Sequence, residues 1–223
     1  MLDAAVRVFA RRGFHAASMD EIADEAHISK PMVYAYLGTK DELFLACLRR
    51  EATSLLEALA AGVRPAAAPD DQLWNGLRAV FGFVAAHRDG WLVLYRQSTE
   101  PFASERRAMR GRIIEVVADL LESACADRPV RGRPEDVIPV AHALVGAAES
   151  MADWLVDHSE EDPDLTATRM MNLVWLGAGN LLDGRTWRGP GTGLTGEGAG
   201  AVNGEHGEDD KEQHGGAGLD GDA

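Results

Sequence analysis

The residues best suited to chemistry in this sequence could contact nucleic acid. Lys30, Pro31, Met32 and Ala35 lie within one short segment. A lysine can donate to the O6 and N7 atoms of guanine, and small apolar side chains can contact thymine methyl groups. A slim helix face with these residue types would fit a DNA major groove, which is about 12 Å wide. The segment therefore predicts a helix that reads bases.

Hydroxyl and ammonium groups flank this segment and could contact phosphates. Tyr34 and Tyr36 carry phenol hydroxyls, Ser18 and Ser29 precede two predicted helices, and Lys40 lies in the first turn of a third. The free N–H groups and positive dipole at a helix start already attract anions. Such contacts would position a protein on DNA without reading its sequence. Each lysine, taken alone, could instead be a solvated surface residue, and Tyr36 could be partly buried.

Capping signals predict where the helices around these residues begin and end. Residues Ser18 to Glu21 and Thr39 to Glu42 each form a capping box, which marks a helix start. Gly13 and Gly38 are expected to end the preceding helices. Two short helices joined by a break at residues 27–29, beneath a first helix, make up a helix-turn-helix.

The run SMDEIADEAHISKPMVYAYLGTKDELFL, residues 18–45, closely resembles the N-terminal DNA-binding domain of the TetR family of bacterial regulators. The matching positions are Phe9, Gly13, Phe14, Ser18, Ile22, Ala23, Ala26, Ile28, Ser29, Tyr34, Tyr36, Lys40, Glu42 and Leu43. The resemblance covers about residues 1–48. It implies a ligand-responsive transcriptional regulator, more often a repressor, that binds a palindromic operator as a homodimer and is released by a small molecule. It also implies that Lys30, Pro31, Met32 and Ala35 read bases.

Two positions depart from the family pattern. His27 stands where members usually have a glycine, at a turn position that should need a positive φ, which histidine tolerates but seldom adopts. Met1 already lies inside the first predicted helix, without the basic N-terminal extension common in the family. Together with the acidic composition, these departures leave an alternative open: a helical small-molecule-binding protein that has lost DNA binding.

The acidic charge is distributed away from the predicted DNA-binding segment. The chain of 223 residues has a net charge of -14, but residues 1–50 contain seven basic and seven acidic groups and are neutral. Residues 51–188 and residues 189–223 each carry -7. Repulsion from phosphates is screened within about 10 Å, so the distribution is compatible with DNA as a partner.

The remaining sequence patterns favour a cytoplasmic protein that is not an enzyme. Residues 70–188 contain no catalytic motif, phosphate loop or metal-ligand cluster, so no cofactor and no metal are expected. No stretch reaches the roughly 18 apolar residues of a membrane span, and the first residues do not form a signal peptide.

The periodicity predicts an all-α fold of about nine helices without strands. Residues 1–48 form the predicted three-helix DNA-binding domain, and residues 49–188 the helical ligand-binding and dimerisation domain. Residues 189–223 contain twelve glycines and eight acidic groups. They are expected to form a disordered tail, because they offer too little apolar surface to offset chain entropy.

Aromatic residues concentrate in the middle of the predicted sensor domain. The resemblance places a ligand pocket among the central helices, and the candidates to line it are Phe81, Trp91, Tyr95, Met109 and His142. The aromatic residues could equally be ordinary core, and His142 could be a core histidine near the interface residue Glu149. Arg96 could bind an anionic group or face solvent.

The last two predicted helices carry small residues surrounded by large apolar ones. Small residues allow close helix approach, and one helix pair cannot bury this much apolar area. An isologous four-helix dimer interface is therefore expected from Gly146, Met151, Trp154, Leu155, Met170, Leu173, Val174, Gly177 and Leu181.

Overall fold

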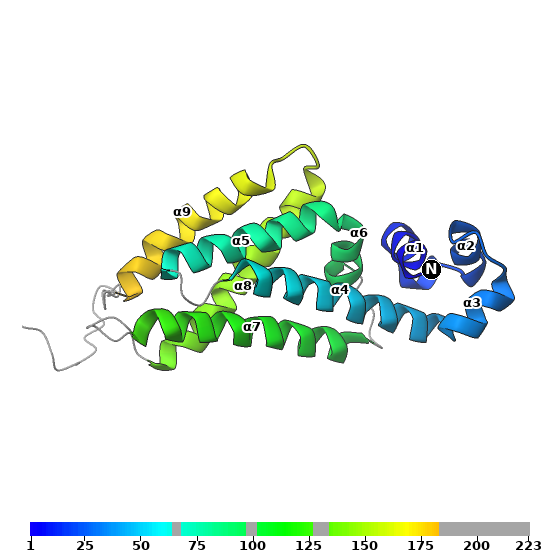
Figure 1. Cartoon of the computed structure of the whole chain (residues 1–223), viewed down its shortest axis with the longest axis horizontal. Coiled ribbons are helices and arrows are strands. Elements are labelled where there is room, and N and C mark those ends of the chain that lie inside the picture. The colour runs from blue at the N-terminus through cyan, green and yellow to red at the C-terminus, as the bar shows by residue number, and fades with distance from the viewer. Residues whose placement is uncertain (64–67, 97–101, 127–133, 183–223) are drawn as a thin grey trace, which may run out of the picture. The chain divides into compact units, whose positions relative to one another are not determined.

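The computed structural model describes residues 1–63, 68–96, 102–126 and 134–182. Within these ranges the chain forms nine α-helices and one π-helical segment, and no strand (Figure 1). The predicted all-α fold is therefore confirmed. The predicted tail, residues 189–223, lies outside the described residues.

The helices follow one another with short connections (Figure 1). The first four are α1 (Leu2–Ala16), α2 (Met19–Glu25), α3 (Lys30–Leu37) and α4 (Lys40–Gly62). The others are α5 (Pro69–Ala86), α6 (Arg88–Trp91), the π-helical segment η1 (Leu92–Arg96), α7 (Ala103–Ala126), α8 (Pro134–Asp157) and α9 (Pro163–Leu182). α6 and η1 follow each other without a break over residues 88–96. The predicted boundary between residues 48 and 49 falls inside the continuous helix α4.

A cluster of phenylalanines forms the core beneath the N-terminal helices. Phe9 and Phe14 of α1 pack on Phe44 of α4 with ring centroids 5.0 Å away in each case. Phe102, which directly precedes α7, lies 4.8 Å from Phe44 and 5.2 Å from Phe14. Gly13, at φ 79°, kinks α1 next to this cluster. The helix-turn-helix is therefore anchored to later parts of the chain through aromatic packing.

Both predicted capping boxes are present. The Ser18 and Thr39 side chains accept hydrogen bonds from the backbone N–H groups of Glu21 and Glu42, and each glutamate accepts from its cap residue in return. Gly38 joins α3 to α4 at φ 70°, where a Cβ would overlap the Glu42 carboxylate. The joint thus requires glycine.

Ser29 precedes α3 but makes no side-chain cap hydrogen bond. Pro31 has no N–H to donate, and the Met32 N–H donates instead to the Ser29 carbonyl oxygen at 2.9 Å. The Ser29 side chain is exposed at the start of α3.

His27 adopts the backbone conformation that the turn was expected to require. Its φ is 55°, and it is the one described non-glycine residue with a positive φ. The Ile28 N–H donates to the Ala23 carbonyl oxygen at 3.1 Å, which closes the end of α2 around this residue. A left-handed conformation costs a non-glycine residue about 1 kcal/mol or more.

The His27→Gly variant is therefore expected to be more stable than the parent by about 0.5–1 kcal/mol, after the entropy that glycine adds to the unfolded chain is subtracted. Urea unfolding followed by circular dichroism would measure this. The control Glu57→Gly, at an exposed position in the interior of α4, should instead lose about 1 kcal/mol. Equal losses in both variants would contradict strain at His27.

The C-terminal helices pack around a second core. α5 contacts α4, α8 and α9, while α7 packs along α8, as Figure 1 shows. The buried residues there include Phe81, Val84, Trp91, Leu94 and Met170. α6 and η1 contact α1, α4 and α5, so this short segment touches both cores.

Candidate DNA-binding surface and apolar cavity

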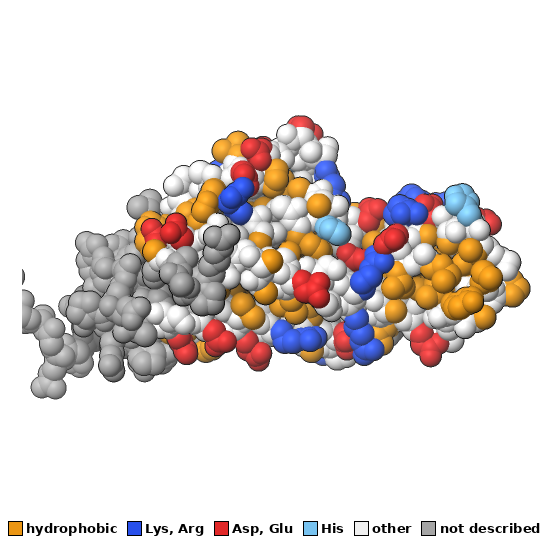
Figure 2. All heavy atoms as spheres, in the orientation of Figure 1, with side chains coloured by type: hydrophobic (Ala, Val, Ile, Leu, Met, Phe, Trp, Pro, Cys, Tyr) orange, Lys and Arg blue, Asp and Glu red, His pale blue; other side chains and the backbone are white. Residues whose placement is uncertain are grey.

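The α3 helix exposes one face and buries the other. Val33 is fully buried, whereas Lys30, Pro31, Met32, Tyr34, Ala35 and Tyr36 are exposed. Figure 2 shows hydrophobic side chains gathered over this helix. Tyr34 is 47% and Tyr36 68% exposed, so the alternative of a partly buried Tyr36 is wrong. The structure thus brings the predicted base-reading residues together on one accessible surface.

Ion pairs connect α1 and α2 beside this surface. Arg7 Nε lies 2.7 Å from the Glu25 carboxylate, which Arg11 also contacts, and Arg12 contacts Glu21 at 3.1 Å. The hydrogen bonds from Arg7 and Arg11 lower the pKa of Glu25, and the bond from Arg7 contributes most. The three arginine side chains are about half exposed. Exposed ion pairs of this kind add little to stability. They link α2 to α1.

Lys30 is exposed but has a partner. Its Nζ lies 2.8 Å from an Asp20 carboxylate oxygen at the start of α2. The hydrogen bond to Asp20 raises the pKa of Lys30, so the ammonium stays charged. A guanine contact would require Lys30 to leave or share Asp20, and both side chains are at least half exposed.

Lys40 differs from its predicted role. The sequence predicts a phosphate contact, but Lys40 Nζ donates to the carbonyl oxygens of Ala17 at 3.1 Å and His15 at 3.3 Å. It also lies 4.8 Å from the centre of the Phe14 ring. Carbonyls left unpaired at the end of a helix attract cations. Lys40 therefore fastens the end of α1 to the start of α4. Ser18, also predicted to contact phosphate, is half-buried and its hydroxyl is engaged in the α2 capping box.

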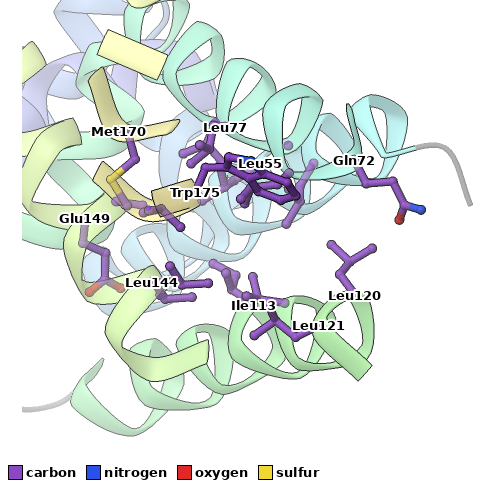
Figure 3. Close-up of a pocket in the computed structure, with 18 of the residues that line it drawn as sticks. Leu55, Gln72, Leu77, Ile113, Leu120, Leu121, Leu144, Glu149, Met170 and Trp175 are labelled. Carbon is purple, nitrogen blue, oxygen red and sulfur yellow. The ribbon is translucent and has the colours of Figure 1, made fainter. Parts of the chain in front are cut away.

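An apolar cavity of about 120 Å³ lies among the C-terminal helices. Figure 3 shows side chains of α4 and α5 facing those of α7, with Glu149 at one end and Gln72 at the other. The aliphatic lining consists of Leu55, Leu59, Leu73, Leu77, Val80, Ile113, Val117, Leu120, Leu121, Leu144, Val145, Ala148, Met170 and Val174. An apolar cavity of comparable size can hold a benzene-sized molecule.

Two of the five predicted lining residues, Trp91 and Tyr95, lie on this cavity, with their rings stacked 3.9 Å apart. The other three do not. Phe81 is buried in the core beside it, Met109 lines a separate polar hollow near α4, and His142 is exposed. The reason is helical phase: α8 turns Leu144 and Ala148 toward the cavity, and His142 then points the other way. The alternative of a core His142 is wrong for the same reason.

The sequence analysis did not predict the aliphatic residues of the cavity wall, because it selected lining candidates mainly by aromatic type. Leu73, Leu77 and Val80 of α5 are spaced three or four residues apart and share one face. That spacing is the signal that could have found them, although it does not distinguish a cavity wall from ordinary core.

The cavity has one polar end. Arg110 Nε of α7 donates to both Glu149 carboxylate oxygens, at 2.8 and 3.1 Å, and Glu149 lines the cavity. Burial raises the pKa of the nearby Tyr95 phenol, and the Glu149 charge acts in the same direction. Among the described lining residues, Glu149 is the only one with a charged side chain.

Polar contacts fasten α6 and η1 to α8. Trp91 Nε1 donates to Asp153 at 2.9 Å, and Arg96 forms an ion pair with Asp157 at 2.7 Å. Arg88 donates to the carbonyl oxygen of Val156. Arg96 is exposed, as the solvent-facing alternative expected, and it pairs with a carboxylate of the chain.

A buried carboxylate links α4 to its neighbours. Glu51 is 3% exposed and accepts a hydrogen bond from Arg50 Nε at 2.9 Å. Arg50 also donates to Asp3 of α1 at 2.7 Å, and His87 Nδ1 lies 4.0 Å from Glu51. Gly90 of α6 approaches so closely that a Cβ there would overlap the Glu51 carboxylate. Glu51 therefore connects α4 and α6, and Arg50 extends the connection to α1.

Two family profiles match the chain. Residues 1–47 match the profile "Bacterial regulatory proteins, tetR family", and residues 69–177 match "Tetracyclin repressor-like, C-terminal domain". A transcriptional repressor of Streptomyces coelicolor is 32% identical over 70% of this chain and 76% of its own length. The chain belongs to the TetR family.

Further relatives agree with this assignment to the TetR family. The transcriptional activator FasR of Mycolicibacterium smegmatis is 29% identical over 81% of this chain and 82% of its own. The crystal structure of a TetR-like regulator from Rhodococcus sp. RHA1 is 45% identical and covers 80% of this chain and 93% of its own, with a TM-score of 0.69. The protein is thus a helix-turn-helix transcriptional regulator, and the matched families are not families of enzymes. None of the described helices combines the length and hydrophobicity that a membrane span requires.

The predicted dimer residues of this TetR protein fall on two different faces. Leu155, Met170 and Val174 are buried in the chain's own core, so their assignment to an interface is wrong. Gly146, Met151 and Trp154 are half-buried on α8, and Leu173 is 70% exposed on α9. The burial of Gly177 and Leu181 lies outside what the structure describes. Both faces of α9 are apolar in places, so sequence alone could not decide which one turns inward.

Proposed function

We propose that this TetR-family regulator is a homodimeric repressor that binds a palindromic operator and is released when a small molecule enters the apolar cavity. The observation that supports it most is the accessible α3 face, with Lys30, Pro31, Met32 and Ala35 beside two exposed tyrosines. The dimer would use the exposed faces of α8 and α9, which include Leu173. Operator binding would take place in the cytoplasm, where bacterial DNA lies.

Each part of the chain has a distinct task in this proposal. Residues 1–48 bind DNA, residues 49–188 bind the effector and the second subunit, and residues 189–223 form an appended tail. Two α3 helices of a dimer would enter major grooves about 34 Å apart, one helical turn of DNA. The tyrosines and Ser29 would contact phosphates on either side of each groove.

The α6–η1 segment offers a physical connection between cavity and DNA. Trp91 and Tyr95 line the cavity, and Gly90 in the same segment abuts Glu51 of α4. A ligand that moves this segment would act on α4 and, through Arg50 and Asp3, on α1. Allosteric coupling of about 1–3 kcal/mol would change operator affinity by about 5- to 150-fold.

Substitutions on α3 test DNA recognition. Lys30→Ala is expected to lower specific affinity by about tenfold, because one bidentate base contact is lost. Tyr34→Ala should weaken binding to all sequences by a similar factor and leave the salt dependence unchanged, because a neutral phenol releases no counterion. A gel shift with DNA from upstream of the protein's own gene, over a range of salt concentrations, measures both effects.

Arg107→Ala, at an exposed position of α7, is the matched control and should leave affinity unchanged. A reporter driven by the same DNA should be more active in cells that lack the protein. The absence of any salt-sensitive, sequence-specific shift would favour a binding protein that has lost DNA recognition.

A further inference from the structure

The charges at the cavity limit what can occupy it. We propose that the effector is electrically neutral, with an apolar body and one hydrogen-bonding group that lies against Tyr95 and Glu149. This inference rests on the proposed function, because it concerns the ligand of the same cavity. It adds the chemical class of that ligand and the residues that select it.

The apolar body follows from the lining. Aliphatic side chains from five helices surround the cavity, and Gln72 and Glu149 are separated at its two ends (Figure 3). Each buried methylene of a ligand would raise affinity about fourfold. A charged group placed among these side chains would lose its hydration without a partner.

The neutral head group follows from the polar end. The Arg110 guanidinium is already bonded to both oxygens of Glu149, so it has no uncompensated charge to offer a carboxylate. A ligand carboxylate would lie beside the Glu149 carboxylate and would have to compete with it for Arg110. A ligand ammonium would have to displace Arg110 from Glu149. Both ionic classes are therefore disfavoured.

A neutral polar group suits the same end. The raised pKa of Tyr95 keeps its phenol protonated over the physiological range, so the phenol can donate to a ligand oxygen. The carboxylate oxygens of Glu149 have further lone pairs and can accept from a hydroxyl or amide N–H. A hydroxyl group, or an amide with an N–H, would satisfy both residues, whereas an ester or ketone oxygen would satisfy only Tyr95.

The test uses three probes of equal length and different charge: octan-1-ol, octanoate and octylammonium. Binding to the full-length protein at pH 8 is followed by isothermal titration and by the fluorescence of Trp91 and Trp175, which line the cavity. We expect octan-1-ol to bind at least tenfold more tightly than either ion. Octanoate that binds as tightly as octan-1-ol would overturn the proposal.

Glu149→Gln makes the test specific to the cavity. This variant removes the negative charge and leaves Arg110 uncompensated, so octanoate should bind at least tenfold more tightly than it binds the parent. The control Glu115→Gln changes an exposed carboxylate of α7. It should change neither the affinity for octan-1-ol nor the affinity for octanoate. Unaltered selectivity in Glu149→Gln would also overturn the proposal.

Tyr95→Phe provides a second variant in case Glu149→Gln is poorly folded. Loss of the phenol donor should weaken octan-1-ol binding about fivefold, and equal binding by parent and variant would count against the proposal. Neither titration involves DNA. Octanoate that binds and releases the operator would refute neutrality while the repressor proposal stands. Octan-1-ol that binds without changing operator affinity would support neutrality and refute release by ligand.

Discussion

The Leu173→Asp variant is expected to be a monomer at micromolar concentration and to bind the operator at least 100-fold more weakly than the parent. Leu173 is 70% exposed on α9, and Leu165 of the same helix is 43% exposed. In a two-fold dimer the same patch meets itself, so a new carboxylate would face its own copy as well as lose apolar contact. A single subunit then holds only one half-site.

Sedimentation velocity measures the assembly, and a gel shift measures operator affinity. Thermal unfolding should remain cooperative, because Leu173 lies outside the chain's own core. The matched control is Val116→Asp, an exposed apolar position of α7 that lies outside the proposed interface; it should remain dimeric. A dimeric Leu173→Asp protein with full affinity would show that α9 is not the interface.

The Arg50→Ala variant is expected to lower the free energy of unfolding by about 3 kcal/mol, because it leaves a buried carboxylate without its cation. Glu51 is 3% exposed and Arg50 is its closest cationic partner among the described residues. The loss should be visible as a lower midpoint in urea unfolding. Operator affinity should fall too, since Arg50 also holds Asp3 of α1.

Two further variants distinguish the effect of an unpaired buried carboxylate from the effect of losing the arginine side chain. The double variant Arg50→Ala with Glu51→Gln should recover part of the loss, because no unpaired charge remains. Arg49→Ala removes an exposed pair with Glu105 and should lower the unfolding free energy by no more than about 1 kcal/mol. Similar losses for Arg49→Ala and Arg50→Ala would argue against a special role for Glu51.

Local signals predicted the N-terminal helices well. The two capping boxes depend on residues only three positions apart, and the structure contains both. The positive φ at His27 followed from the resemblance, because TetR-family members usually have a glycine at this turn position. The exposed face of α3 carries the residues that were expected to lie there, and Val33 on the opposite face is buried.

The C-terminal site was harder to predict because it depends on contacts distant in sequence. Arg110 meets Glu149 across 39 positions, and Arg50 meets Asp3 across 47. Periodicity identified the helices but could not show which apolar side of α9 faces inward, and Met170 was therefore misplaced. The partners of Lys40 within the chain could not be predicted, because they are backbone carbonyls, which residue types do not reveal.

The short joint at Gly38 and Thr39 has a mechanical consequence for the regulator. The joint is closed by a glycine that no other residue can replace without overlap and by a capping box. α3 should therefore follow α4 as a rigid extension. α4 has 23 residues and a length of about 34 Å. A tilt of about 6° at its far end would displace α3 by about 3.5 Å, close to the 3.4 Å rise of one base pair. An angular change that small would put each recognition helix out of step with its half-site.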